Sequence, residues 1–216
     1  MTRRAVVFDL DGTLVDSRLD IARSLSHTLD VLGHPARSLE EIFSYIGEGL
    51  RVLVERGLPG SARTDAEIDR GVQVFRTYYM LHPTDQTEPY AGVVEALDGL
   101  QERGVLLAIL TNKQGEVARL VVERLGLAGR FEVILGGGDV PELKPQPSGL
   151  LACCARLGVA PADAWYVGDL PLDVETARRA GTRSAAAAWG YGDRDALEAE
   201  GPHVLLQSAA GILGLS

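Results

Sequence analysis

One stretch decides the fold: Val6-Val7-Phe8-Asp9-Leu10-Asp11-Gly12-Thr13-Leu14-Val15-Asp16-Ser17, an apolar run that ends in two carboxylates. The uncharged residues 5–8 are rich in β-branched and aromatic side chains, which predicts a buried strand. Gly12 then allows the chain to turn sharply. Asp9 and Asp11 should therefore project from the carboxyl end of this strand, which is the edge where open α/β sheets bind ligands.

A short Asp-x-Asp-Gly string is, on its own, usually a turn, and it also begins many calcium loops. An EF-hand loop requires glycine at its sixth position and glutamate at its twelfth. Leu14 and Asp20 occupy those positions when Asp9 is counted as the first, so the spacing excludes an EF-hand. The motif predicts a site only if further polar residues follow the later strands.

Composition narrows the class of protein. With 216 residues, 46% of them hydrophobic, the chain can bury one core, with or without a small accessory domain. The 21 basic and 30 acidic residues give a net charge of -9 without a long basic cluster, so we expect a small solute rather than nucleic acid as partner. No apolar run approaches the roughly 20 residues that span a bilayer, so we expect no membrane association and a cytoplasmic protein. The adjacent Cys153 and Cys154 lack metal-binding companions, which predicts buried free thiols.

Lysine is almost absent from the chain. Of the 21 basic residues, only Lys113 and Lys144 are lysines, and the rest are arginines. A bias of this strength fits genomic composition, and a position that keeps lysine against it indicates a need for a compact ammonium instead of a planar guanidinium.

Four helical segments follow the first strand without a strand between them, which predicts an inserted all-helical cap domain. The first covers residues 17–32 and stops at Gly33, and a capping box at Ser38 opens the second. Residues 47–49, Gly-Glu-Gly, break the second helix before the third at 50–56. Thr64 caps the fourth.

From Pro89 onward helices and strands alternate, which predicts an α/β fold with a Rossmann-like parallel-sheet core. The expected strands are 105–110, 133–135 and 164–167, with weaker ones at 184–188 and 204–206. The expected helices between them end near residue 103 and cover 116–125 and 150–157. We therefore expect a discontinuous core, residues 1–15 and 85–216, and a cap, residues 16–84.

Polar residues recur where these strands end. Thr111-Asn112-Lys113 follows Leu110, Lys144-Pro145 follows the loop after residue 135, and Gly168-Asp169 with Asp173 follows Val167. Each group alone is compatible with a turn or a helix cap, and Thr111 and Asp173 are plausible N-caps. Their repetition at successive strand ends predicts one site at one edge of the sheet.

Together these motifs resemble a known family. The order Asp9-x-Asp11-Gly12-Thr13, Thr111, Lys144-Pro145 and Gly168-Asp169-x-x-x-Asp173 is similar to the four-motif signature of the haloacid dehalogenase superfamily of phosphotransferases, and the helical insertion resembles its cap. Within that superfamily, residues 45–49, 111–113, 137–140 and 144–147 look most like those of phosphoglycolate phosphatases.

The chemistry of the residues agrees with this resemblance. A phosphate monoester dianion repels an anionic attacker, so a phosphatase needs cations around the phosphoryl group and a positioned nucleophile. Asp9 is the candidate nucleophile, which forms an aspartyl-phosphate, and Asp11 is the candidate acid and base. Several carboxylates in one cleft require a divalent cation, and an all-oxygen ligand set suits Mg²⁺.

The resemblance implies further roles. Asp9 and Asp169 would supply metal carboxylates, Asp11 its backbone carbonyl, and Asp173 support behind them. Lys144 would offset the charge on Asp9 and the phosphoryl oxygens, and Thr111 and Asn112 would bind the phosphate with the amides of a helix start. In the cap, Gly47 and Glu48 would face the rest of the substrate. Glu48 is unsuited to a substrate carboxylate unless its side chain points away.

The expected activity is thus Mg²⁺-dependent hydrolysis of a small phosphorylated metabolite, with 2-phosphoglycolate as the first candidate, by a monomer or homodimer. Asp11 disfavours a hydrolytic dehalogenase, which protonates no alkoxide, and residues 16–84 lack the Schiff-base lysine of a phosphonoacetaldehyde hydrolase. A phosphomutase, nucleotidase or pyrophosphatase with the same core remains an alternative, as does a non-catalytic binding protein.

Overall fold

The computed structural model describes residues 4–215. Residues 1–3, which belong to the predicted core, and residue 216 lie outside the described residues. Within residues 4–215, the central feature is a six-stranded parallel sheet with the order β5-β4-β1-β6-β7-β8. Its strands are β1 (Ala5–Phe8), β4 (Leu106–Gln114), β5 (Val133–Gly137), β6 (Ala164–Gly168), β7 (Arg183–Ala187) and β8 (Val204–Leu206). The predicted α/β class is confirmed.

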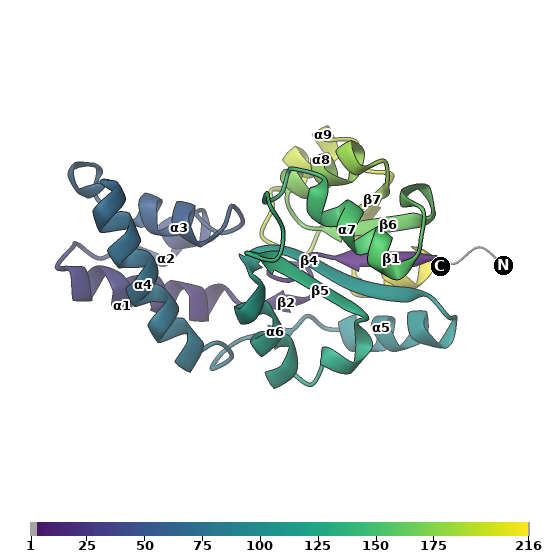
Figure 1. Cartoon of the computed structure of the whole chain (residues 1–216), viewed down its shortest axis with the longest axis horizontal. Helices are drawn as coiled ribbons and strands as arrows, with labels where there is room; N and C mark the ends of the chain where they lie inside the picture. The colour runs from purple at the N-terminus through teal and green to yellow at the C-terminus, as the bar shows by residue number, and fades with distance from the viewer. Residues whose placement is uncertain (1–3, 216) are drawn as a thin grey trace.

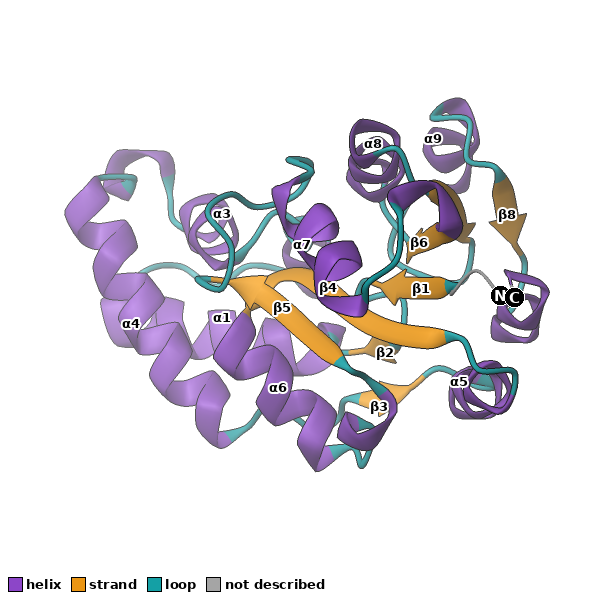
Figure 2. Ribbon diagram, turned by 45° about the vertical axis from the view of Figure 1, so that its right-hand side comes forward, coloured by secondary structure: helices purple, strands orange, loops and turns teal. Residues whose placement is uncertain are grey.

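Helices cover both faces of this sheet, as Figure 2 shows. They are α5 (Val93–Glu102), α6 (Gly115–Arg124), α7 (Ser148–Leu157), α8 (Pro171–Ala180) and α9 (Arg194–Ala199). Because successive side chains of a strand point to opposite faces, Val6 and Phe8 pack with α5 and α6, whereas Ala5 and Val7 pack with α7 and α8. The thiols of Cys153 and Cys154 on α7 are buried and free, as predicted. Short 3-10 helices cover Gly60–Ala62, Ala128–Arg130, Pro161–Asp163 and Ala209–Leu215.

The four cap helices stand together beside the sheet, at the left of Figure 1. They are α1 (Arg18–Leu32), α2 (Leu39–Phe43), α3 (Leu50–Gly57) and α4 (Asp65–Leu81). The predicted capping box is present at Ser38, and the Thr64 side chain accepts a hydrogen bond from the Glu67 N–H at the start of α4. The arrowheads of β1 and β5 point toward these helices (Figure 2), so the cap faces the carboxyl ends of the strands.

The chain crosses between sheet and cap twice, and the two connecting segments are joined by strand pairing and hydrogen bonds. β2 (Val15–Asp16) pairs antiparallel with β3 (Glu88–Pro89), a contact that the sequence did not predict. The buried carboxylate of Asp20 on α1 also accepts hydrogen bonds from the Gln86 N–H at 2.9 Å and the Thr87 hydroxyl at 2.7 Å. The predicted boundaries of core (1–15 and 85–216) and cap (16–84) lie close to this link and stay predictions.

One predicted boundary that matters for the site is wrong. The strand expected to end at Leu110 continues as β4 to Gln114, with an irregular register between those residues. Thr111 therefore lies inside the strand and does not cap a helix, since α6 begins only at Gly115. Among residues 4–215 we find no helix with the length and apolar character that a bilayer crossing requires.

Candidate active site

Three adjacent strands deliver the aspartates and the threonine of the predicted site to one edge of the sheet. Asp9 follows β1, Thr111 lies near the end of β4, and Asp169 follows β6. β1 lies between β4 and β6. After β1 the chain adds β4 and β5 on one side of it, and then adds β6, β7 and β8 on the other side. Such a reversal of strand order is where doubly wound α/β folds bind ligands.

Asp9 and Asp173 share one lysine. Lys144 Nζ lies 3.0 Å from Asp9 Oδ1 and 2.7 Å from Asp173 Oδ1, and all three side chains are buried. Burial disfavours the ammonium, but the two carboxylates outweigh it and raise the pKa of Lys144. The Asp173 carboxylate is held further by the Leu170 N–H at 3.0 Å. Lys144 thus supplies a fixed positive charge beside the candidate nucleophile.

One oxygen of Asp9 still lacks a hydrogen-bond donor. Although Lys144 Nζ is within ion-pair distance, its direction is not that of a hydrogen bond, so Asp9 Oδ1 accepts none within residues 4–215. Burial, with further repulsion from Asp173 and Asp11, raises the pKa of Asp9 to about 6 against the pull of Lys144. A buried carboxylate oxygen that accepts no hydrogen bond has room for a further partner, such as a bound ion or a reacting group.

Two more carboxylates lie close to that of Asp9. Asp9, Asp169 and Asp173 each have an oxygen within 4.8 Å of the others, close enough to hold one metal ion. Burial, and then the charges of Asp173 and Asp9, raise the pKa of Asp169 well above its usual range. The Thr13 hydroxyl and the Tyr191 N–H each donate to Asp169 at 2.8 Å and fix its position. A hard cation such as Mg²⁺ fits this all-oxygen donor set.

The turn after β1 is possible only with glycine. Gly12 has φ +86°, and a Cβ atom there would stand 2.2 Å from Asp169 Oδ2. Gly12 therefore lets the loops that follow β1 and β6 approach each other closely, which brings Asp169 next to Asp9.

Asp11 points to a different set of partners. Its carboxylate accepts hydrogen bonds from Ser17 Oγ at 2.5 Å and from Lys113 Nζ at 3.0 Å to each oxygen. Its carboxylate does not belong to the group of Asp9, Asp169 and Asp173 that could hold a metal. The two aspartates of the opening motif thus have different surroundings. Asp9 pairs with Lys144, and Asp11 pairs with Lys113.

Asn112 connects the loop of Lys144 to the cap. Its Oδ1 accepts a hydrogen bond from the Lys144 N–H at 2.8 Å, and its Nδ2 donates to the Gly47 carbonyl at 3.1 Å. Thr111 Oγ1 accepts from the Lys113 N–H at 3.2 Å and its side chain is buried at the cavity. The side chain of Asn112 therefore orients other parts of the site.

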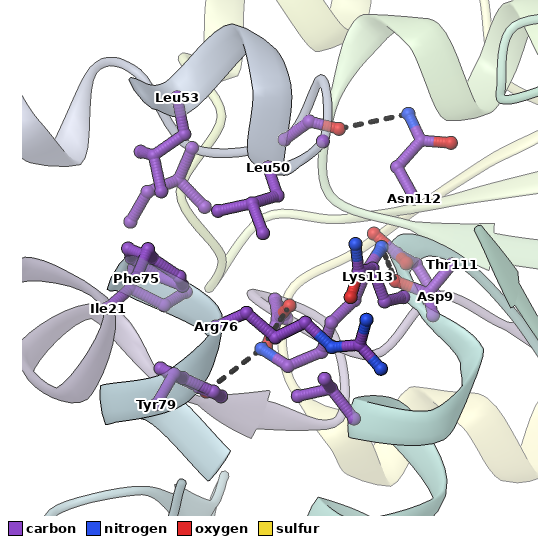
Figure 3. A pocket seen from close by; sticks show the side chains of 16 residues that line it. Asp9, Ile21, Leu50, Leu53, Phe75, Arg76, Tyr79, Thr111, Asn112 and Lys113 are labelled. Carbon is purple, nitrogen blue, oxygen red and sulfur yellow. Dashed lines mark hydrogen bonds and ion pairs between the residues drawn. The ribbon is translucent and has the colours of Figure 1, made fainter. Parts of the chain in front are cut away.

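A cavity of about 70 Å³ lies between cap and core, and Figure 3 shows side chains from both around it. Asp9, Asp11, Thr111 and Lys113 line it from the core. The cap wall is mostly apolar, with Arg76 as its charged residue, and consists of Ile21, Ile46, Gly47, Gly49, Leu50, Leu53, Phe75, Arg76 and Tyr79.

The structure does not bring Glu48 to this cavity. Its carboxylate pairs with Arg56 at 2.6 Å, and the side chain is 52% exposed. Gly47 and Gly49 on either side do line the cavity. Arg51, the basic residue nearest to this turn in the sequence, is engaged by Asp65 and Asp69 of α4. The Glu48 carboxylate therefore points away from the cavity.

Sequence reasoning missed several residues of the site. In the sequence Lys113 stands out only as one of two lysines, and no motif marks Tyr79. Tyr191, whose N–H holds Asp169, follows a weak strand late in the chain and carries no recognisable motif. These residues meet the motif only through the tertiary fold.

Comparison with known proteins agrees with this geometry. Residues 6–187 match the family model described as haloacid dehalogenase-like hydrolase. A phosphoglycolate phosphatase of Aquifex aeolicus is 39% identical over 87% of this chain and 86% of its own, and one of Chromobacterium violaceum is 38% identical over 91% and 90%. A crystal structure from Haemophilus somnus, described as a predicted phosphoglycolate phosphatase, superposes with a TM-score of 0.92 at 28% identity, covering 100% of this chain and 98% of that one. The chain belongs to the haloacid dehalogenase-like hydrolase family.

Proposed function

We propose that this hydrolase is an Mg²⁺-dependent phosphatase that converts 2-phosphoglycolate to glycolate and phosphate through an aspartyl-phosphate on Asp9. The observation that carries the proposal is the state of Asp9, which lines the cavity with one oxygen that no donor satisfies. A carboxylate that is paired with a fixed ammonium, accepts no hydrogen bond at one oxygen and lies next to two other acids that could hold a metal is suited to attack on phosphorus.

The first half of the reaction transfers the phosphoryl group. A carboxylate oxygen of Asp9 attacks phosphorus, and the bond from phosphorus to the ester oxygen breaks. Asp11 gives a proton to the departing alkoxide, and Lys144 offsets negative charge around the phosphoryl group. Thr111, which lines the same cavity, binds the phosphoryl oxygens. The cavity residues of the cap exclude bulk water from this step.

The second half regenerates the enzyme. Water attacks the phosphorus of the aspartyl-phosphate, Asp11 accepts the proton that the water loses, and phosphate leaves with Asp9 restored. Asp9 and Asp169, with the backbone carbonyl of Asp11, would hold Mg²⁺, and Asp173 would support them. Mg²⁺ bound there supplies positive charge that lets a dianion approach the carboxylates.

The size and lining of the cavity support a small substrate. A cavity volume of about 70 Å³ between cap and core favours a small phosphate ester over a nucleotide. Gly47 and Gly49 bring backbone of the cap to the cavity, and no side chain caps the start of α3, so its amides are available to an anion. The relatives that are named phosphoglycolate phosphatases support a phosphate ester with a carboxylate tail.

Metal removal tests the proposal. Phosphate release from 2-phosphoglycolate should stop in excess chelator and return with Mg²⁺, whereas Ca²⁺ should restore little, because its looser and higher coordination displaces Asp9. Asp9→Asn should release no phosphate with either metal. Full turnover in chelator, or turnover by Asp9→Asn, contradicts the proposal.

A further inference from the structure

Both lysines of the chain lie at the candidate active site, Lys144 buried and Lys113 partly buried, and each pairs with one aspartate of the opening motif. Lys144 pairs with Asp9, and Lys113 pairs with Asp11. The proposed chemistry uses Lys144 but gives Lys113 no task. In a chain whose other basic residues are arginines, a lysine here indicates a place that a guanidinium does not fit.

The contacts of Lys113 use the full capacity of its ammonium group. Nζ lies 3.0 Å from both oxygens of Asp11 and 2.9 Å from the hydroxyl of Tyr79. It also lies 4.5 Å from the centroid of the Tyr79 ring. An ammonium has three donors, so these three acceptors satisfy it completely. Burial disfavours its charge, but the Asp11 carboxylate and Tyr79 outweigh burial and raise the pKa of Lys113.

The three residues come from both parts of the molecule. Asp11 follows β1, and Lys113 lies near the end of β4. Tyr79 lies on α4 of the cap. Figure 3 shows Tyr79 directed from its helix toward the Lys113 ammonium. Ser17 Oγ also donates a hydrogen bond to Asp11, at Oδ1. Without Lys113, the carboxylate of Asp11 would keep only its hydrogen bond to Ser17.

We propose that Lys113 is a positioning residue that holds the carboxylate of Asp11 toward the substrate while Tyr79 of the cap lies over it. The acid and base of the reaction is then aligned when α4 covers the cavity. This inference rests on the proposed phosphatase function, because it assigns Lys113 an effect only through Asp11. A group that is displaced by about 1 Å from its productive position can lose about a hundredfold in rate.

A double-mutant cycle tests the inference. Lys113→Met should lower kcat for 2-phosphoglycolate on the order of tenfold to a hundredfold, with little change in KM. The loss in kcat/KM, which reports the phosphoryl-transfer step, should be much smaller for p-nitrophenyl phosphate, whose leaving group needs no proton from Asp11. Adding Lys113→Met to Asp11→Asn should slow the enzyme no further, because residues that act as a unit are not additive.

Tyr79→Phe provides a second, milder variant that keeps the ring and removes one oxygen. It should show the same dependence on the leaving group with a smaller loss, and it should also be non-additive with Asp11→Asn. Tyr78→Phe is the matched control, because Tyr78 is the neighbouring tyrosine on α4 and stacks on His27 instead, with ring centroids 4.1 Å apart. Its kinetics should equal those of the wild type.

The outcomes separate this inference from the function on which it rests. A wild type that hydrolyses no phosphate ester overturns the proposed function. If the wild type is active, equal losses of kcat/KM on both esters, or losses that add to that of Asp11→Asn, overturn the role of Lys113 alone. If Lys113→Met does not fold, the cycle of Tyr79→Phe with Asp11→Asn decides the question by the same criteria.

Discussion

Two opposing effects act on the pKa of Asp9: burial raises it, and the charge of Lys144 lowers it. Its pKa is raised from 3.8 to about 6, chiefly because burial disfavours the carboxylate, although Lys144 opposes this. The folded chain therefore binds this proton more tightly than the unfolded chain does. Without metal, this group's contribution to the free energy of unfolding should fall as the pH rises from about 4 to about 6.

Mg²⁺ should reverse that dependence, because a metal ligand must be deprotonated. We expect Mg²⁺ affinity to weaken as the pH falls below about 6, and binding near pH 6 to release protons. Calorimetry of Mg²⁺ binding in two buffers of different ionisation enthalpy measures that release. Heats that are independent of the buffer at pH 6 would show that no ligand of the metal titrates there.

Glu48 gives a second prediction at the residue scale. Because its carboxylate pairs with Arg56 on the exposed side of the cap turn, Glu48→Gln should leave the ratio of kcat/KM for 2-phosphoglycolate and p-nitrophenyl phosphate unchanged. The comparison of the two esters with wild type and variant measures this ratio. A selective gain for 2-phosphoglycolate would mean that Glu48 faces the substrate in the working enzyme.

At the scale of elements, the sequence predicts what local pattern controls. β1 and β6 are found from short apolar runs, and α2 and α4 from their capping side chains, because these signals are contained within a few residues. The end of β4 is not found, since Thr111 to Gln114 are polar yet extended. β2 and β3 have two residues each and pair across the whole cap, so no local pattern marks them.

The same reasoning explains which part of the site could be predicted. Asp9, Asp11 and Asp169 follow strands that the sequence identifies, so their convergence follows from the order of a parallel sheet. The contacts of Tyr79 with Lys113 and of Tyr191 with Asp169 depend on how separate elements pack. No spacing in the sequence contains that information.

The loop after β7 contributes a prediction at this scale. A Cβ atom at Gly190 would lie 2.2 Å from Asp169 Cβ and 2.4 Å from the Gly12 carbonyl oxygen, and that backbone cannot yield without moving the site. Gly190→Ala should weaken Mg²⁺ binding on the order of tenfold to a hundredfold, as changes behind metal ligands do. Titration with Mg²⁺ measures the effect.

The control for this variant is Gly129→Ala, since nothing lies within 4 Å of a Cβ atom built at Gly129. Its Mg²⁺ affinity should match that of the wild type. If Gly190→Ala also binds Mg²⁺ with wild-type affinity, the close packing of these loops does not position Asp169.

At the scale of the whole molecule, we propose that the core performs the chemistry and the cap selects the substrate. The sheet edge supplies Asp9, Asp11, Thr111, Lys144 and Asp169, whereas the cap adds an apolar wall and the backbone of Gly47 and Gly49. Asn112 with Gly47, and Lys113 with Tyr79, join the two parts directly at the cavity. Closure of the cap and alignment of the reacting groups should therefore occur together.

The central claim is tested most directly by phosphate release from a panel of phosphate esters in the presence of Mg²⁺. The panel contains 2-phosphoglycolate, sugar phosphates, nucleoside monophosphates, pyrophosphate and p-nitrophenyl phosphate, each measured with the wild type and with Asp9→Asn. We predict that the wild type has its highest kcat/KM with 2-phosphoglycolate and that Asp9→Asn releases phosphate from none of the panel. Release from no ester, or a clear preference for a nucleotide or pyrophosphate, would contradict the account.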